Sequence, residues 1–84
     1  MLNKAILIGR LTKDPETKYA QNGTAVTNFT LAVDRTFKNK DGQKEADFIP
    51  VVSWRKTAEL CEKYLSKGSQ VAVSGRIQTR SHLS

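Results

Sequence analysis

The residues best suited to take part in chemistry are aromatic side chains set beside cations in the stretch 47–56. This stretch is rich in β-branched and aromatic residues, which is typical of a strand. Because side chains alternate across a strand, Phe48 and Trp54 share one face, about 20 Å apart at roughly 3.3 Å per residue. Arg55 and Lys56 follow at once. Exposed flat rings bordered by cations form a surface on which nucleic-acid bases can stack.

The opposite face of this stretch can supply a core, because it carries Ile49, Val51 and Ser53. An alternative places Phe48 and Trp54 in the core as well. Large aromatic side chains are more often buried than exposed, and a two-sheet sandwich would bury both faces. For this stretch taken alone, burial is the more common outcome, and the rest of the chain favours exposure.

A third aromatic residue, Phe37, lies in a strongly basic segment. Arg35, Lys38 and Lys40 surround it, and no aliphatic residue is close in sequence. An aromatic residue in such a setting favours a binding function, with a simple loop anchor as the alternative. Asp41-Gly42 predicts a hairpin turn. We therefore expect residues 37–46 to form a charged, flexible hairpin tip that can fold over an extended ligand.

Length and charge narrow the class of partner. The chain has 84 residues and a formal charge of +6, which indicate one small domain (1–84) suited to a polyanion. The charge is uneven, because no acidic residue follows Glu62. The cations beyond that point are Lys63, Lys67, Arg76 and Arg80. A protein that is basic for solubility alone is the alternative.

Residues that could support catalysis are scarce. The chain has one histidine, His82 near its end, and one cysteine, Cys61. Acidic pairs such as Asp14 and Glu16 lack the spacing of metal ligands. We predict no catalytic residue, no metal and no cofactor. A single cysteine, no apolar run of membrane-spanning length and no signal-peptide cleavage site predict a cytoplasmic protein.

The elements that must position these residues follow from periodicity. Apolar residues on both faces of 5–11 predict a first strand covered on both sides, with Gly9 as a bulge or bend. Segment 12–23 reads as a connection, with Asn22-Gly23 as a hairpin signal and Tyr19 packed across its base. Alternation predicts a second strand over 24–34. Its core face comprises Ala25, Thr27, Phe29, Leu31 and Val33.

The period changes to that of a helix after Lys56. Thr57 is placed to cap this helix and Gly68 to end it. Its predicted core stripe comprises Ala58, Leu60, Cys61, Tyr64 and Leu65. Alternation over 71–79 predicts a fourth strand with a polar face that includes Arg76. The predicted class is all-β with one helix, and the order of elements matches a five-strand barrel of the OB type that lacks its last strand within this chain.

A series of short blocks, in order along almost the whole chain, resembles the N-terminal domain of bacterial single-stranded DNA-binding proteins. The blocks include Leu2-Asn3-Lys4-Ala5-Ile6-Leu7-Ile8-Gly9-Arg10-Leu11, Asp14-Pro15-Glu16, Tyr19, Asn22-Gly23-Thr24-Ala25-Val26, Asn28-Phe29-Thr30-Leu31-Ala32-Val33, Trp54-Arg55-Lys56, Tyr64-Leu65, Lys67-Gly68-Ser69 and Gly75-Arg76-Ile77-Gln78-Thr79-Arg80.

This resemblance implies an OB fold that binds single-stranded DNA with little sequence preference and protects it in replication, recombination and repair, in the cytoplasm at the nucleoid. It implies base stacking at Phe37, Phe48 and Trp54. His82 lies where relatives carry Trp or Tyr, so it either stacks or belongs to a frayed end. The predicted phosphate contacts, some implied by the resemblance and the rest by nearby charge, are Arg35, Lys40, Arg55, Lys56, Lys67, Arg76 and Arg80.

The resemblance also implies a homotetramer, with a dimer as the alternative, and we expect the first strand to be the contact. It places a hairpin, a fifth strand and an acidic partner-recruiting tail after Ser84, so we do not expect tail-mediated replication partners for these 84 residues. A fragment, a gap filled by another chain and a short gene all remain open. Two rival functions are RNA binding through the same surface and a purely structural subunit.

Overall fold

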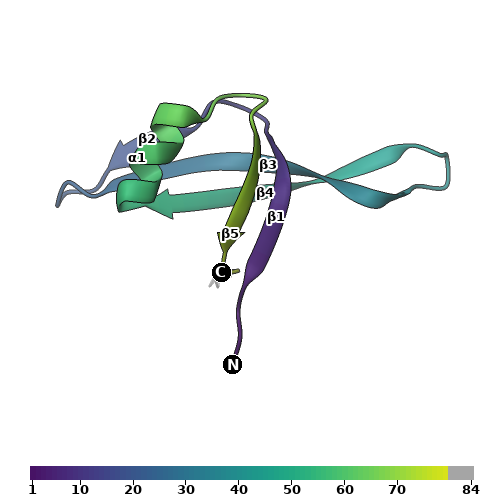
Figure 1. The fold of residues 1–84 in the computed structure, drawn as a ribbon, viewed down its shortest axis with the longest axis horizontal. Helices are drawn as coiled ribbons and strands as arrows, with labels where there is room; N and C mark the ends of the chain where they lie inside the picture. The colour runs from purple at the N-terminus through teal and green to yellow at the C-terminus, as the bar shows by residue number, and fades with distance from the viewer. Residues whose placement is uncertain (80–84) are drawn as a thin grey trace, which may run out of the picture.

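The computed structural model describes residues 1–79, which form five strands and one helix (Figure 1). The elements are β1 (Ala5–Leu11), β2 (Glu16–Tyr19), β3 (Ala25–Lys38), β4 (Lys44–Trp54), α1 (Arg55–Tyr64) and β5 (Gln70–Gly75). The chain is therefore mostly β with one helix, as the sequence predicted.

The long strand β3 is the centre of one antiparallel sheet. One edge of β3 pairs with β4 along most of its length, and the other edge is shared by β2 and β1. β1 pairs in turn with β5. In Figure 1, β1 and β5 run across the direction of β3 and β4, and α1 lies over the end of the sheet near β2. This curled five-stranded sheet with a helix between its last two strands has the arrangement of an OB fold.

Strand boundaries differ from the prediction at several points. β1 has the predicted bounds, whereas β3 and β4 extend into the segment expected to be a flexible tip. β5 ends at Gly75, four residues before the predicted Thr79. β2 was not predicted, because its sequence Glu-Thr-Lys-Tyr is short and polar and looks like part of a loop. It is not the strand that the resemblance places after Ser84.

The core lies on the inner face of β3. Phe29 and Leu31 pack with Leu11 of β1, and all three are buried. Partly buried residues from every side surround them: Leu7, Val33, Val51, Cys61, Leu65, Val71 and Val73. The alternation predicted for β3 is therefore confirmed, and this packing fixes which face of each strand points outward.

A buried polar network joins the helix to the sheet. The hydroxyl of Thr27 donates to the carbonyl of Ala58 at 2.9 Å. A hydroxyl has one proton, so in the 2.6 Å contact between Thr17 and Thr27 the donor is Thr17. Ser53 donates to the Thr27 carbonyl at 3.2 Å. Thr27 thus links β2, β4 and α1 without leaving a buried hydroxyl unpaired.

The helix corrects three expectations. It begins at Arg55 and has no side-chain cap, so the predicted cap at Thr57 is wrong. It ends at Tyr64, and Gly68 instead adopts φ of 89° in a later turn, where its N–H donates to the Leu11 carbonyl. Tyr64 and Leu60, both placed in the predicted core stripe, are 67% and 48% exposed rather than buried. The sheet covers one side of the helix only, so Tyr64 in its last turn lies outward, whereas Leu65, in the extended backbone that follows the helix, packs against the core.

Two expectations for β1 also change. A Cβ on Gly9 would lie 2.3 Å from the Ala32 carbonyl oxygen, so glycine permits a close approach of β1 to β3. Gly9 lies where β1 begins to pair with β3. The β1–β5 register runs through Gly9 without a bulge, so the bulge alternative is wrong. The outer face of β1 is not covered in the single chain, because Ile6 and Ile8 are 68% and 60% exposed.

Candidate nucleic-acid interface

The outer face of β4 carries two exposed aromatic rings. Phe48 is 67% exposed and Trp54 is 51% exposed, while Val51 and Ser53 on the same strand face inward. The pairing of β4 with β3 holds this register, because a shift by one residue would move the rings to the inner face. The burial alternative for these two rings is therefore wrong.

The neighbours of these rings on β3 leave room above them. Ala32 lies opposite Phe48, and Val26 lies opposite Trp54. Between them, Asn28 and Thr30 face positions of β4 that also point outward. All of these side chains, and those of Pro50 and Val52 on β4, are smaller than the two rings, so the rings are the bulkiest groups on this part of the outer face. Flat ligands can stack there without displacing a large side chain.

A shallow groove, largely open to solvent, lies beside Trp54. Arg55 and Arg76 line it together with Trp54. The remaining lining residues are Ala20, Asn22, Thr24 and Gln78. An aromatic ring next to two guanidinium groups can hold a base and an adjacent phosphate at once.

The backbone at Arg55 is unusual. Its φ is 60°, in the left-handed region that a residue with a Cβ seldom adopts. Such a conformation persists where the surrounding structure requires it, and it is common at binding sites. Here it marks the turn from β4 into α1, where the strand that bears Trp54 ends.

The opposite wall of the groove is the turn between β2 and β3. Asn22-Gly23 forms the predicted hairpin, with Gly23 at φ of 83° and the Asn22 side chain accepting from the Thr24 N–H at 3.0 Å. Sequence patterns identified this turn but not its place opposite Trp54. The groove residues Asn22, Thr24 and Gln78 were therefore missed as site residues.

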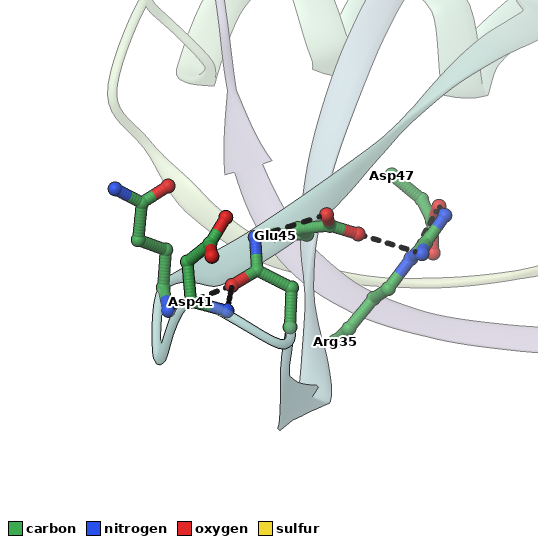
Figure 2. Close-up of polar contacts among 6 residues, drawn as sticks. Arg35, Asp41, Glu45 and Asp47 are labelled. Atoms are coloured by element: carbon green, nitrogen blue, oxygen red, sulfur yellow. Dashed lines mark hydrogen bonds and ion pairs between the residues drawn. The ribbon is translucent and has the colours of Figure 1, made fainter.

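The β3–β4 hairpin extends away from α1 and ends in a turn at residues 39–43 (Figure 1). Phe37, near this turn, is 80% exposed. The side-chain oxygen of Asn39 accepts from the Asp41 and Gln43 N–H groups at 3.0 and 2.9 Å (Figure 2). The tip is thus a hydrogen-bonded turn with Phe37 and Lys40 exposed beside it.

The guanidinium of Arg35 forms ion pairs with the carboxylates of Glu45 and Asp47, as Figure 2 shows. Its Nε and Nη2 donate to Asp47 at 3.1 and 2.9 Å, and its Nη1 donates to Glu45 at 2.9 Å. The hydrogen bonds between Arg35 and Asp47 lower the pKa of the Asp47 carboxyl and raise the pKa of the Arg35 guanidinium, which the charge of Glu45 raises further. The prediction that Arg35 contacts phosphate overlooked this pairing, because the register that aligns β3 with β4 is not visible in sequence.

The other predicted cations are spread over several elements. Lys56 is exposed in the first turn of α1. Lys67 is exposed between α1 and β5, where its backbone N–H donates to Asp14 at 2.8 Å. Arg80 and His82 lie outside the described residues. The structure thus brings Trp54, Arg55 and Arg76 together and leaves Lys40, Lys56 and Lys67 at separate places.

Residues 1–79 contain no cluster of three or more side chains that could bind a metal. Within the same residues, no helix has the length and apolar character needed to cross a membrane.

Comparison with known proteins gives consistent matches along this chain. Residues 2–83 match the model of the single-strand binding protein family. Single-stranded DNA-binding protein 2 of Clostridium acetobutylicum is 68% identical over 82 residues, which are 96% of this chain and 61% of the relative. Relatives from Halalkalibacterium halodurans and Bacillus subtilis, a single-stranded DNA-binding protein and single-stranded DNA-binding protein A, are 61% and 57% identical; each match covers 98% of this chain and 49% and 48% of the relative. The chain thus spans about half to three fifths of the length of these relatives, and it belongs to the single-strand binding protein family.

Proposed function

We propose that residues 1–84 form one OB-type domain that binds single-stranded DNA with little sequence preference and protects it during replication, recombination and repair. Family membership and the names of the relatives support this proposal. The observation that carries it is the pair of exposed rings, Phe48 and Trp54, on one face of β4. This function is binding, without catalysis, and its DNA partner implies a place in the bacterial cytoplasm at the nucleoid.

The proposed mechanism has an electrostatic step and a stacking step. Cations attract the phosphate backbone and release condensed counterions. Phe37, Phe48 and Trp54 then stack bases, at roughly 1–3 kcal/mol each. The proposed phosphate contacts are Lys40, Arg55, Lys56, Lys67 and Arg76, all of them exposed. Arg80 and His82 remain proposals from the sequence, and Arg35 is left out because two carboxylates hold it.

Selectivity follows from which base faces are available. In a duplex the bases stack on one another and hide their faces, so the stacking term acts on single strands. Around Asn28 and Thr30 the outer surface is a sheet face, which suits stacking of unpaired bases. Preference for single strands with little preference for sequence is the expected result.

We further propose that the chain assembles with copies of itself through β1, as a dimer or a tetramer. Ile6 and Ile8 are exposed on its outer face, opposite Ser74 and Ala72 of β5. Two large aliphatic side chains side by side on a solvent face are stabilised when a second copy covers them. Light scattering at micromolar concentration should give at least twice the mass of one chain, and a folded monomer would contradict the proposal.

One titration tests the binding proposal. Trp54 is the only tryptophan, so it is a built-in reporter of its own surface. Polythymidine should quench its fluorescence, and a duplex of equal length should do so much less. Equal or tighter binding of polyuridine would favour an RNA-binding function instead. Absence of quenching and of any measured affinity for either oligomer would leave only a structural subunit.

A further inference from the structure

The end of β5 is tied to the N-terminal segment by a side chain. The last backbone pair of the β1–β5 ladder joins Ala5 and Gly75. If the ladder continued in the same register, the next pair would be Lys4 with Arg76, and the pair after it would be Asn3 with Ile77. At that position the Asn3 amide donates to the Ile77 carbonyl at 2.7 Å and accepts from the Ile77 N–H at 2.9 Å. Asn3 thus extends the ladder by the reach of its side chain, past the point where strand pairing ends.

This tie acts on a segment with little other support. No strand pairing of the described residues continues beyond Gly75, although the chain runs on to Thr79. Both backbone groups of Ile77 are satisfied by the same amide, which fixes the position and the direction of the chain there. In Figure 1 the N-terminal segment and the end of β5 lie next to each other, in agreement with these contacts.

Ile77 stands between two residues of the groove. Arg76 and Gln78, its neighbours in sequence, line the groove beside Trp54. Because the two flanking residues of an extended segment lie on the same side, fixing the Ile77 peptide groups sets where both side chains start. The position of the Arg76 guanidinium therefore depends on an uncharged residue 73 positions earlier in the chain.

We propose that Asn3 is a positioning residue for nucleic-acid binding: its amide holds Arg76 in the groove, so that a backbone phosphate meets Arg76 while the adjacent base stacks on Trp54. This inference depends on the proposed function. Without the tie, residues 76–79 gain conformational freedom, and ordering Arg76 around a phosphate then costs entropy at the moment of binding. Pre-organisation of a single phosphate contact is the predicted contribution of Asn3.

The salt dependence of binding distinguishes positioning from a general structural effect. Asn3 is uncharged, so its removal changes the counterion balance only through a cation that it places. We would measure polythymidine affinity by Trp54 fluorescence across a salt series for Asn3→Ala, Arg76→Ala and the double variant. Each single variant should flatten the log–log slope by about 0.7 and weaken binding about fivefold at low salt, which is one phosphate contact on a single strand. The double variant should be no weaker than Arg76→Ala alone.

Leu2→Ala is the matched control, because it shortens an exposed side chain one residue away and should leave the slope unchanged. Thermal melting checks that each variant folds. If Asn3→Ala does not fold, the salt slope of Asn3→Ser replaces it, because the serine hydroxyl is too short to bridge both backbone groups of Ile77. A normal slope in the Asn3 variants beside a flattened slope in Arg76→Ala overturns the proposal and leaves the binding function intact. Additive losses in the double variant overturn it as well. If wild-type protein does not bind polythymidine, the proposed function itself fails.

Discussion

Phe29 and Phe48 lie on the two paired strands at the centre of the molecule, and their environments are opposite. Phe29 is 7% exposed and packs with Leu11 and Leu31 on the inner face, whereas Phe48 projects from the outer face. The side chains have the same chemistry, and the strands share one register. The difference shows that the position within the alternation, rather than residue type, decides whether an aromatic ring of this ribbon is buried in the core or exposed on the outer face.

This comparison predicts that substitutions on the two faces have separable effects. A change on the inner face should lower the free energy of unfolding and leave the affinity of the folded protein unchanged. A change on the outer face should do the reverse.

The largest effect is expected from Leu31→Ala. Leu31 is fully buried at the centre of the core, so its truncation leaves a cavity and should cost about 2–5 kcal/mol of unfolding free energy. Urea denaturation followed by circular dichroism measures this loss. The fraction that stays folded should bind polythymidine with normal affinity. A variant with normal stability and weakened binding would break the assignment of the inner face.

Trp54→Ala is the counterpart on the outer face. Its loss should weaken polythymidine binding by about 1–3 kcal/mol, the usual contribution of one stacked base. Stability should change little, because half of the ring is already in solvent. Calorimetric titration is needed here, since the variant lacks the fluorescent reporter. Early melting with normal binding would show that the indole supports the core instead.

Alternation could be predicted from the sequence because one strong constraint determines it. A strand with one covered face repeats every two residues, so the inward positions of β3 followed directly from the pattern. For β4 the pattern placed Phe48 and Trp54 on one face, and only the rest of the chain favoured exposure of that face. The prediction for Tyr19 was wrong for a related reason. It was expected to pack across the base of a loop, but it lies at the end of β2, where none of the described residues covers its outer side and it is 64% exposed.

The site was predictable residue by residue but not as an assembly. Parity within one strand places the two rings on one face, and the rest of the chain favoured exposure of that face. The groove requires the β2–β3 turn, the start of α1 and the segment after β5 to meet, and no local pattern specifies that meeting. Arg35 is an example. In the sequence it lies in a basic segment and appears available for phosphate, but the facing strand β4 pairs it with two carboxylates.

A smaller effect should separate two cations that look alike in sequence. Lys56 is exposed on α1, and no ion pair involves it among the described residues. Lys56→Ala should flatten the slope of log affinity against log salt by about 0.7. Arg35→Met should flatten it much less, because Glu45 and Asp47 already neutralise that charge. Equal flattening in both variants would show that Arg35 leaves its carboxylates when DNA binds.

The smallest effect concerns the ion pair itself. Hydrogen bonds from Arg35 lower the pKa of Asp47 in the folded protein, so any stability from this pair is present above the unfolded value of about 3.9 and is lost as the pH falls through the lower folded value. Because both side chains are exposed, the change in melting temperature over this range should be slight. The better measurement is the titration midpoint of the Asp47 carboxyl, monitored by NMR. Arg35→Met should raise the midpoint toward its ordinary value, and Lys18→Met, which alters a cation on β2, should not. An unchanged midpoint in Arg35→Met would mean that the guanidinium is mostly solvated and unpaired in solution. Arg35 would then belong to the cations available for phosphate.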